Sequence, residues 1–112
     1  MAHDRSAPKD IEGAASLTEL VQYQAGAVVS RTILKKLAGT VTVFAFDQGE
    51  GLSEHTAAFD ALVIMIEGEA EISVAGAMHH LSAGHILRLP PGQPHALRAL
   101  ERFKMLLVMI RE

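Results

Sequence analysis

Apolar and polar residues alternate along several short segments of this chain. Segment 40–46 alternates most regularly, with Val41, Val43 and Ala45 on one face, and segment 27–34 is rich in β-branched residues. Turn-forming residues separate such segments at intervals of about 8–12 residues, a spacing typical of sandwiches and barrels. The pattern therefore predicts an all-β fold.

A β-hairpin is predicted over residues 69–82, where polar and apolar positions alternate on both sides of an Ala-Gly pair at 75–76. If that pair forms the turn, His79 lies opposite Ile72, whose side chain belongs to the core face. This register predicts that His79 points into the barrel and His80 points out. A slip of one residue would exchange the two faces.

Two segments, 61–66 and 105–110, are apolar at every position. A strand of a small antiparallel barrel normally exposes one polar face to water. Continuous apolar runs therefore predict a second buried surface, and we expect a homodimer.

The N-terminal part of the chain is expected to form a flexible arm over residues 1–14, followed by a single domain over residues 15–112. A chain of 112 residues is large enough for one core but not for two. Ser16 and Glu19 have the spacing of a capping box, which predicts one helical turn; a loop leading into the first strand is the alternative.

Composition excludes several function classes. The formal net charge is −3 and the basic residues form no cluster, so neither a nucleic acid nor a membrane surface is an expected partner. The chain has no cysteine, which excludes disulfides and thiolate metal ligands. The first residues lack the pattern of a signal peptide and no apolar run approaches a membrane span, so a cytoplasmic location is expected.

The most distinctive stretch is 84–99, in which three prolines and a glycine occupy positions 90–94, directly before His95. Proline fixes φ and lacks an N–H group, whereas glycine frees φ, so this stretch cannot lie within a helix or a central strand. It predicts a rigid corner between two strands that presents the imidazole of His95 to the barrel interior.

The spacing of Gly84, Pro90, Gly92 and His95 resembles the second sequence motif of the cupin family. This resemblance implies a small single-domain cupin of the RmlC-like superfamily. The implied fold is a double-stranded β-helix, the cupin jelly-roll barrel.

Segment 51–68 resembles the first motif of the same family. His55 falls on the first histidine of that motif and Gly68 on its closing glycine. The second histidine and the glutamate fall on Ala57 and Ala61. The resemblance thus implies a metal-binding motif from which two ligands are missing.

In the cupin barrel the two motifs lie on neighbouring strands, so His55 and His95 are expected to point inward with their imidazoles within about 5 Å. Together with His79, Phe59 and Gln93 they form the predicted ligand pocket. Substitution of alanines for two metal ligands favours a module that binds a small molecule.

A metal site is the alternative, because neutral imidazoles on neighbouring strands can share an ion of iron, manganese, zinc or nickel. His55 and His95 are the candidate ligands, with His79 as a third imidazole and Asp60 as a carboxylate that a bulge could turn inward. Such a site would indicate a metal-dependent enzyme of the dioxygenase or isomerase type. A sensory or scaffold role, in which the barrel binds another chain, also remains open.

Overall fold

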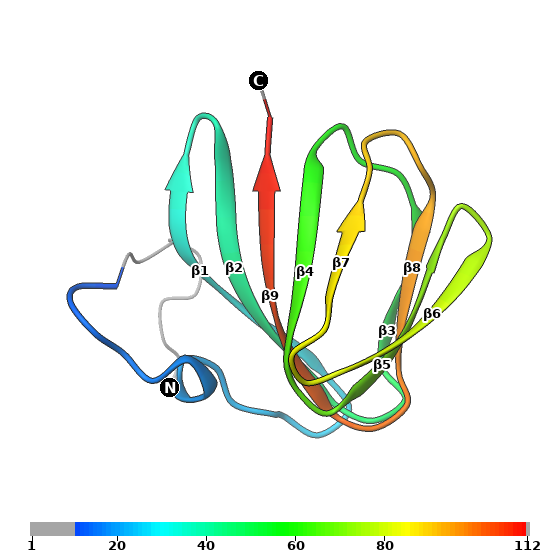
Figure 1. Ribbon diagram of the computed structural model, residues 1–112. Coiled ribbons are helices and arrows are strands. Elements are labelled where there is room, and N and C mark those ends of the chain that lie inside the picture. The colour runs from blue at the N-terminus through cyan, green and yellow to red at the C-terminus, as the bar shows by residue number, and fades with distance from the viewer. Residues whose placement is uncertain (1–10, 112) are drawn as a thin grey trace.

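The computed structural model describes residues 11–111 and consists of two antiparallel β-sheets that face each other (Figure 1). The strands formed by these residues are β1 (Val28–Lys36), β2 (Gly39–Phe46), β3 (Gly51–His55), β4 (Asp60–Glu67), β5 (Glu69–Val74), β6 (Ala77–Ser82), β7 (Ile86–Leu89), β8 (His95–Ala99) and β9 (Phe103–Ile110). One sheet has the order β1-β2-β9-β4-β7 and the other β3-β8-β5-β6. The predicted all-β double-stranded β-helix is confirmed.

Strands far apart in the sequence lie side by side in both sheets. The last strand, β9, runs between β2 and β4, and β8 runs between β3 and β5 (Figure 1). This connectivity winds the chain back and forth between the sheets. It also places the two histidine-bearing segments of the sequence next to each other, in β3 and β8.

The predicted hairpin has the expected register. Ile72 pairs with His79 in β5 and β6, and the turn has positive φ at both Ala75 and Gly76, as a type I′ turn requires. His80 points away from the core and its Nε2 lies 2.6 Å from a carboxylate oxygen of Glu69.

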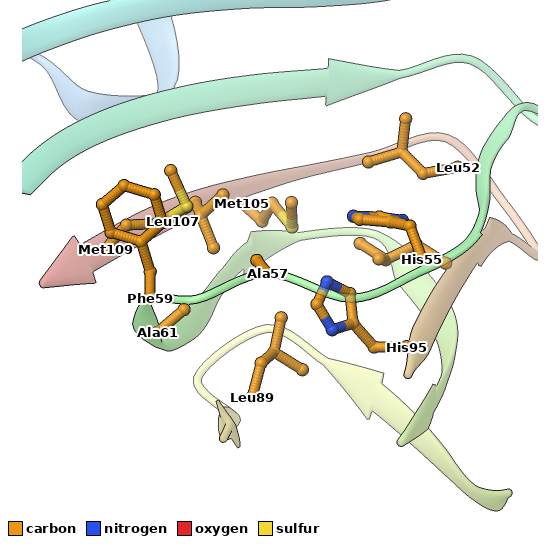
Figure 2. A pocket seen from close by; sticks show the side chains of 11 residues that line it. Leu52, His55, Ala57, Phe59, Ala61, Leu89, His95, Met105, Leu107 and Met109 are labelled. Atoms are coloured by element: carbon orange, nitrogen blue, oxygen red, sulfur yellow. The ribbon is translucent and has the colours of Figure 1, made fainter. Parts of the chain in front are cut away.

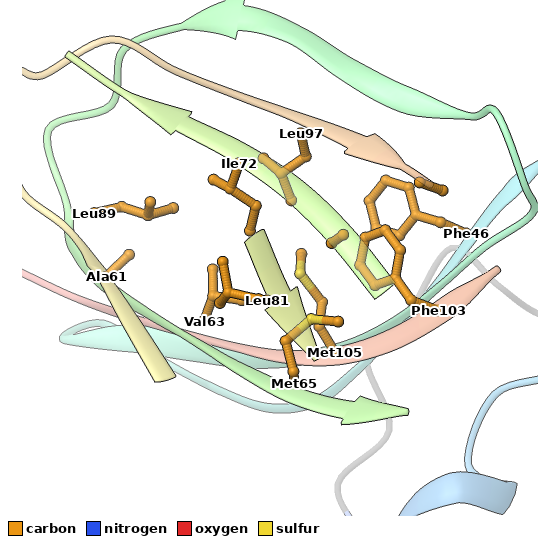
Figure 3. Packing of buried hydrophobic residues seen from close by; sticks show 12 residues of the cluster. Phe46, Ala61, Val63, Met65, Ile72, Leu81, Leu89, Leu97, Phe103 and Met105 are labelled. Carbon is orange, nitrogen blue, oxygen red and sulfur yellow. The ribbon is translucent and has the colours of Figure 1, made fainter. Parts of the chain in front are cut away.

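The main core fills the space between the two sheets. Its largest side chains include Phe46 and Phe103, whose rings stack with centroids 4.4 Å apart (Figure 3). The other large, fully enclosed side chains of this core come from β4, β5 and β9: Val63, Met65, Ile72 and Met105. Gly68 has φ of 84° and its α-carbon lies against the backbone at the start of β9. Glycine is required there because any other residue would strain the backbone and its β-carbon would clash with that strand.

The segment before β1 packs against the outer face of the five-stranded sheet. Val21 joins a second apolar cluster with Val43. The Tyr23 hydroxyl donates a hydrogen bond of 2.6 Å to Glu67, and burial, with this carboxylate beside it, raises the pKa of Tyr23 well above its usual value. The buried Lys104 donates to the Thr18 carbonyl at 2.5 Å.

Part of the outer face stays uncovered within the described residues. Leu62, Ile64 and Val108 are half-exposed there, while Ile86 and Ile110 expose 61% and 54% of their surface. The apolar runs at 61–66 and 105–110 thus have one face in the barrel core and the other only partly covered by residues 11–111.

One turn of 3-10 helix, η1 (Leu17–Glu19), occupies the position of the predicted helical turn. The predicted capping box is wrong, because the Ser16 side chain makes no capping hydrogen bond. Residues 1–10 of the predicted arm lie outside the described residues. No helix within residues 11–111 has the length and apolar character needed to cross a membrane.

Candidate functional site

Two histidines face each other across neighbouring strands. His55 ends β3, His95 begins β8, and the two residues are direct partners in the antiparallel pairing. Their imidazole centroids are 4.4 Å apart and the ring planes are inclined by 70°. The rings therefore lie within the separation expected from the sequence.

The corner at 90–94 holds His95 in place through backbone hydrogen bonds. The N–H of Gly92 donates to the Ala57 carbonyl at 2.8 Å, which ties the corner to the segment that follows His55. The Pro94 carbonyl accepts a second bond of 2.8 Å from Ala75. Gly92 has φ of 77°, which explains the glycine at this point of the corner.

Each imidazole donates a hydrogen bond to the carbonyl oxygen two residues before it. Nδ1 of His55 lies 2.7 Å from the Ser53 oxygen, and Nδ1 of His95 lies 3.3 Å from the Gln93 oxygen. Because a carbonyl oxygen can only accept, Nδ1 carries the proton in both rings. Within residues 11–111 neither Nε2 has a hydrogen-bond partner.

The two histidines differ in burial. His95 exposes only 7% of its surface, whereas His55 is exposed at the edge of the site. Burial lowers the pKa of His95, and the nearby His55 lowers it further, while the hydrogen bond with Gln93 acts in the opposite direction. Desolvation disfavours the charged imidazole, so His95 is a neutral ring at pH 7.

The imidazoles form one end of a cavity of about 70 Å³ inside the barrel (Figure 2). Apart from the two histidines, its wall is entirely apolar: Leu52, Ala57, Phe59, Ala61, Leu89, Leu97, Met105, Leu107 and Met109. Figure 2 shows Phe59, Leu107 and Met109 gathered at the end away from the histidines. The cavity is therefore polar at one end and apolar at the other.

Residues 42–110 match the family model described as the cupin domain. The chain belongs to the cupin family. No curated protein matches it. Among solved structures, this cupin is similar to a conserved protein of unknown function from Streptococcus pyogenes, with 32% identity, coverage of 98% of each chain and a TM-score of 0.87.

Two further solved structures resemble this cupin. A cupin superfamily protein from Desulfitobacterium hafniense is 25% identical, with 95% of this chain and 97% of that chain covered and a TM-score of 0.86. A cupin 2 conserved barrel domain protein from Leptotrichia buccalis is 37% identical, with 84% of this chain but 46% of that chain covered and a TM-score of 0.81.

Three residues predicted to line the site lie elsewhere. His79 is exposed and lines a separate open hollow, although its register was predicted correctly. The Gln93 side chain does not line the cavity; only its carbonyl contributes, by accepting from His95. Asp60 is exposed and forms a two-pronged ion pair of 2.8 and 2.9 Å with Arg88, which lowers the pKa of the carboxyl.

The donor set of this cupin does not fit a resident metal ion. Within residues 11–111 no three histidine or carboxylate side chains come close enough to share an ion. Ala57 and Ala61 line the cavity at the positions where the cupin motif has a histidine and a glutamate. A catalytic metal site needs about three protein ligands, and only His55 and His95 are present.

The sequence predicts apolar walls for the site, but of the residues that form them it identifies only Phe59. Met105, Leu107 and Met109 share the inner face of β9, and an alternating strand reveals which residues share a face. It does not reveal whether the facing sheet fills the space in front of them. Phe59 is the predicted apolar residue that does line the cavity.

Proposed function

We propose that this cupin binds a small organic molecule in the barrel cavity, with His55 and His95 as its polar contacts. The observation that carries the proposal is the pair of unpartnered Nε2 atoms at one end of an otherwise apolar cavity. Concave sites with apolar walls and a few convergent polar groups are the usual form of small-molecule sites. Nε2 of His55 and of His95 can each accept a hydrogen bond from a ligand that lies against this wall.

The alternative, a metal-dependent dioxygenase or isomerase, is less well supported. It would use the same two histidines, but neither His79 nor Asp60 is close enough to complete the ligand set. Binding of a small organic molecule does not need a third metal-coordinating side chain.

A fragment screen by NMR tests the proposed function. Fragments that enter the cavity should shift the methyl signals of Met105 and Met109, whose side chains line it. An Ala61→Val variant, in which the added methyl groups occupy the same space, should lose these shifts, and His80→Ala should keep them. Failure of every fragment to move the two methionine signals, or identical shifts in Ala61→Val, would contradict the proposal.

A homodimer through the uncovered outer face of the five-stranded sheet is also proposed. Ile64 and Ile86 are paired neighbours on this face, and Ile110 extends it along β9. At the edge of the face Asp60 and Arg88 neutralise each other, so two copies can approach without charge repulsion. A second copy supplies a matching apolar surface by two-fold symmetry, whereas a polar partner would not.

The cytoplasmic location expected from the sequence stays a prediction, which fractionation of the producing cells would test.

A further inference from the structure

The hydrogen bonds of His55 and His95 fix what the cavity offers to a ligand. Each Nδ1–H is used by a backbone carbonyl, of Ser53 and Gln93 respectively. In the neutral ring the remaining nitrogen, Nε2, is a hydrogen-bond acceptor with no proton of its own. The polar end of the cavity therefore presents two acceptors and no donor.

The charge around the cavity disfavours an anion. No lysine or arginine of residues 11–111 is among its lining side chains. Arg111 lies against the Phe59 ring, 5.7 Å from its centroid, but donates to the Leu37 carbonyl and does not line the cavity. A carboxylate placed beside His95 would thus face a lone pair and apolar carbon, without any donor to replace its hydration.

The size of the cavity limits how much of a ligand is enclosed. A volume of about 70 Å³ holds only a few water-sized groups, since each needs at least about 10–15 Å³ of such space. A polar head and its first carbon atoms fit beside His95, and the remainder extends along the apolar wall or past the exposed His55. A ligand group without a hydrogen-bond donor makes only apolar contacts in this cavity.

We infer that the ligand is an uncharged molecule with an apolar body and a hydrogen-bond donor, such as a hydroxyl or N–H group, that donates to Nε2 of His95 at the end of the cavity where His55 also lies. This inference deepens the proposed function and rests on it, because both concern the same cavity. It excludes carboxylates and other anions as the preferred class.

Three probes of similar length separate the possibilities: 1-butanol, which has a donor, methyl propyl ether, which has none, and butyrate, which is an anion. Each is titrated into the full chain at pH 7.5, with the side-chain nitrogen signals of the histidines followed by NMR. We expect 1-butanol to shift the Nε2 signal of His95 more than that of His55, and to bind about fivefold more tightly than the ether, as one added hydrogen bond allows. Butyrate should bind more weakly than both.

Variants identify the acceptors. His95→Phe should remove the preference for 1-butanol over the ether, and His80→Phe, on the outside of the barrel, should leave it unchanged. Should His95→Phe not fold, His55→Phe at the exposed position provides the same comparison, with the preference reduced.

The outcomes separate the inference from the proposed function. Equal or tighter binding of the ether or of butyrate would overturn the inferred ligand class, while leaving a cavity that binds small molecules. If no probe shifts any signal from the cavity up to its solubility limit, both the inference and the proposed function fail.

Discussion

Replacement of Ala61 by valine should make the protein more stable, because the cavity beside this residue has room for the added atoms. Ala61 exposes only 7% of its surface and lies in β4, between its partners Leu89 and Met109, with its methyl group at the cavity wall. Valine adds two methyl groups and is favoured in strands.

The expected gain in stability can be estimated in two ways, from the buried methyl groups and from the cavity volume. Burial of two methylene-sized groups contributes about 1.6 kcal/mol at ~0.8 kcal/mol each. Removal of the whole cavity of about 70 Å³ would recover about 1.7 kcal/mol at ~24 cal/mol per Å³. Because one valine cannot fill the space perfectly, we expect the free energy of unfolding to rise by about 1 kcal/mol, equivalent to roughly 4 °C in the melting temperature.

Urea denaturation of both proteins measures this difference, and Ala70→Val is the matched control. Ala70 is also an inward-facing alanine, but it is fully enclosed and does not line the cavity. There the same two methyl groups should overpack the core and lower the free energy of unfolding by about 1–3 kcal/mol. A loss of stability in Ala61→Val as large as in Ala70→Val would refute the cavity.

Three further predictions concern protonation, the N-terminal segment and assembly. Since folding lowers the pKa of His95, the unfolded chain binds a proton at a higher pH than the folded chain does. The free energy of unfolding should therefore fall as the pH drops below about 6.5, until His95 is protonated in the folded chain as well. His95→Phe should show a smaller decline in urea midpoint between pH 8 and pH 5, and an unchanged decline would contradict the assignment. Tyr23→Phe removes the hydrogen bond to Glu67 and should cost about 1–2 kcal/mol of unfolding free energy; a cost near zero would show that the segment is held by its apolar contacts alone. Light scattering should give twice the chain mass for the native protein and the chain mass for Ile64→Asp, so a native monomer at micromolar concentration would refute the dimer.

The fold could be predicted because its signals are local in the sequence. The turn at 75–76 set the register of the hairpin, and the glycines at 68 and 92 occupy the strained backbone positions that the cupin motifs imply. The same motifs predicted that the side chains of His55 and His95 lie close together on neighbouring strands.

The misplaced site residues depend on features that alternation cannot reveal. His79 has the predicted register, but β6 is the edge strand of its sheet, so an inward position near the start of the strand is not covered by the opposite sheet. Asp60 could be placed next to a motif position, but its pairing with Arg88 depends on the alignment of β4 with β7. The cavity itself depends on side-chain volumes from several strands.

Whether His55 and His95 receive an organic molecule or a metal ion is decided most directly by elemental analysis. The untagged protein is incubated with one equivalent of Zn²⁺, Mn²⁺, Fe²⁺ or Ni²⁺, passed through a gel-filtration column and analysed, with His95→Phe as the reference for adventitious binding. Two imidazoles without a third ligand should retain far less than one ion per chain, and no more than His95→Phe retains. Retention of one ion per native chain, lost in His95→Phe, would contradict the assignment of this cavity to an organic ligand.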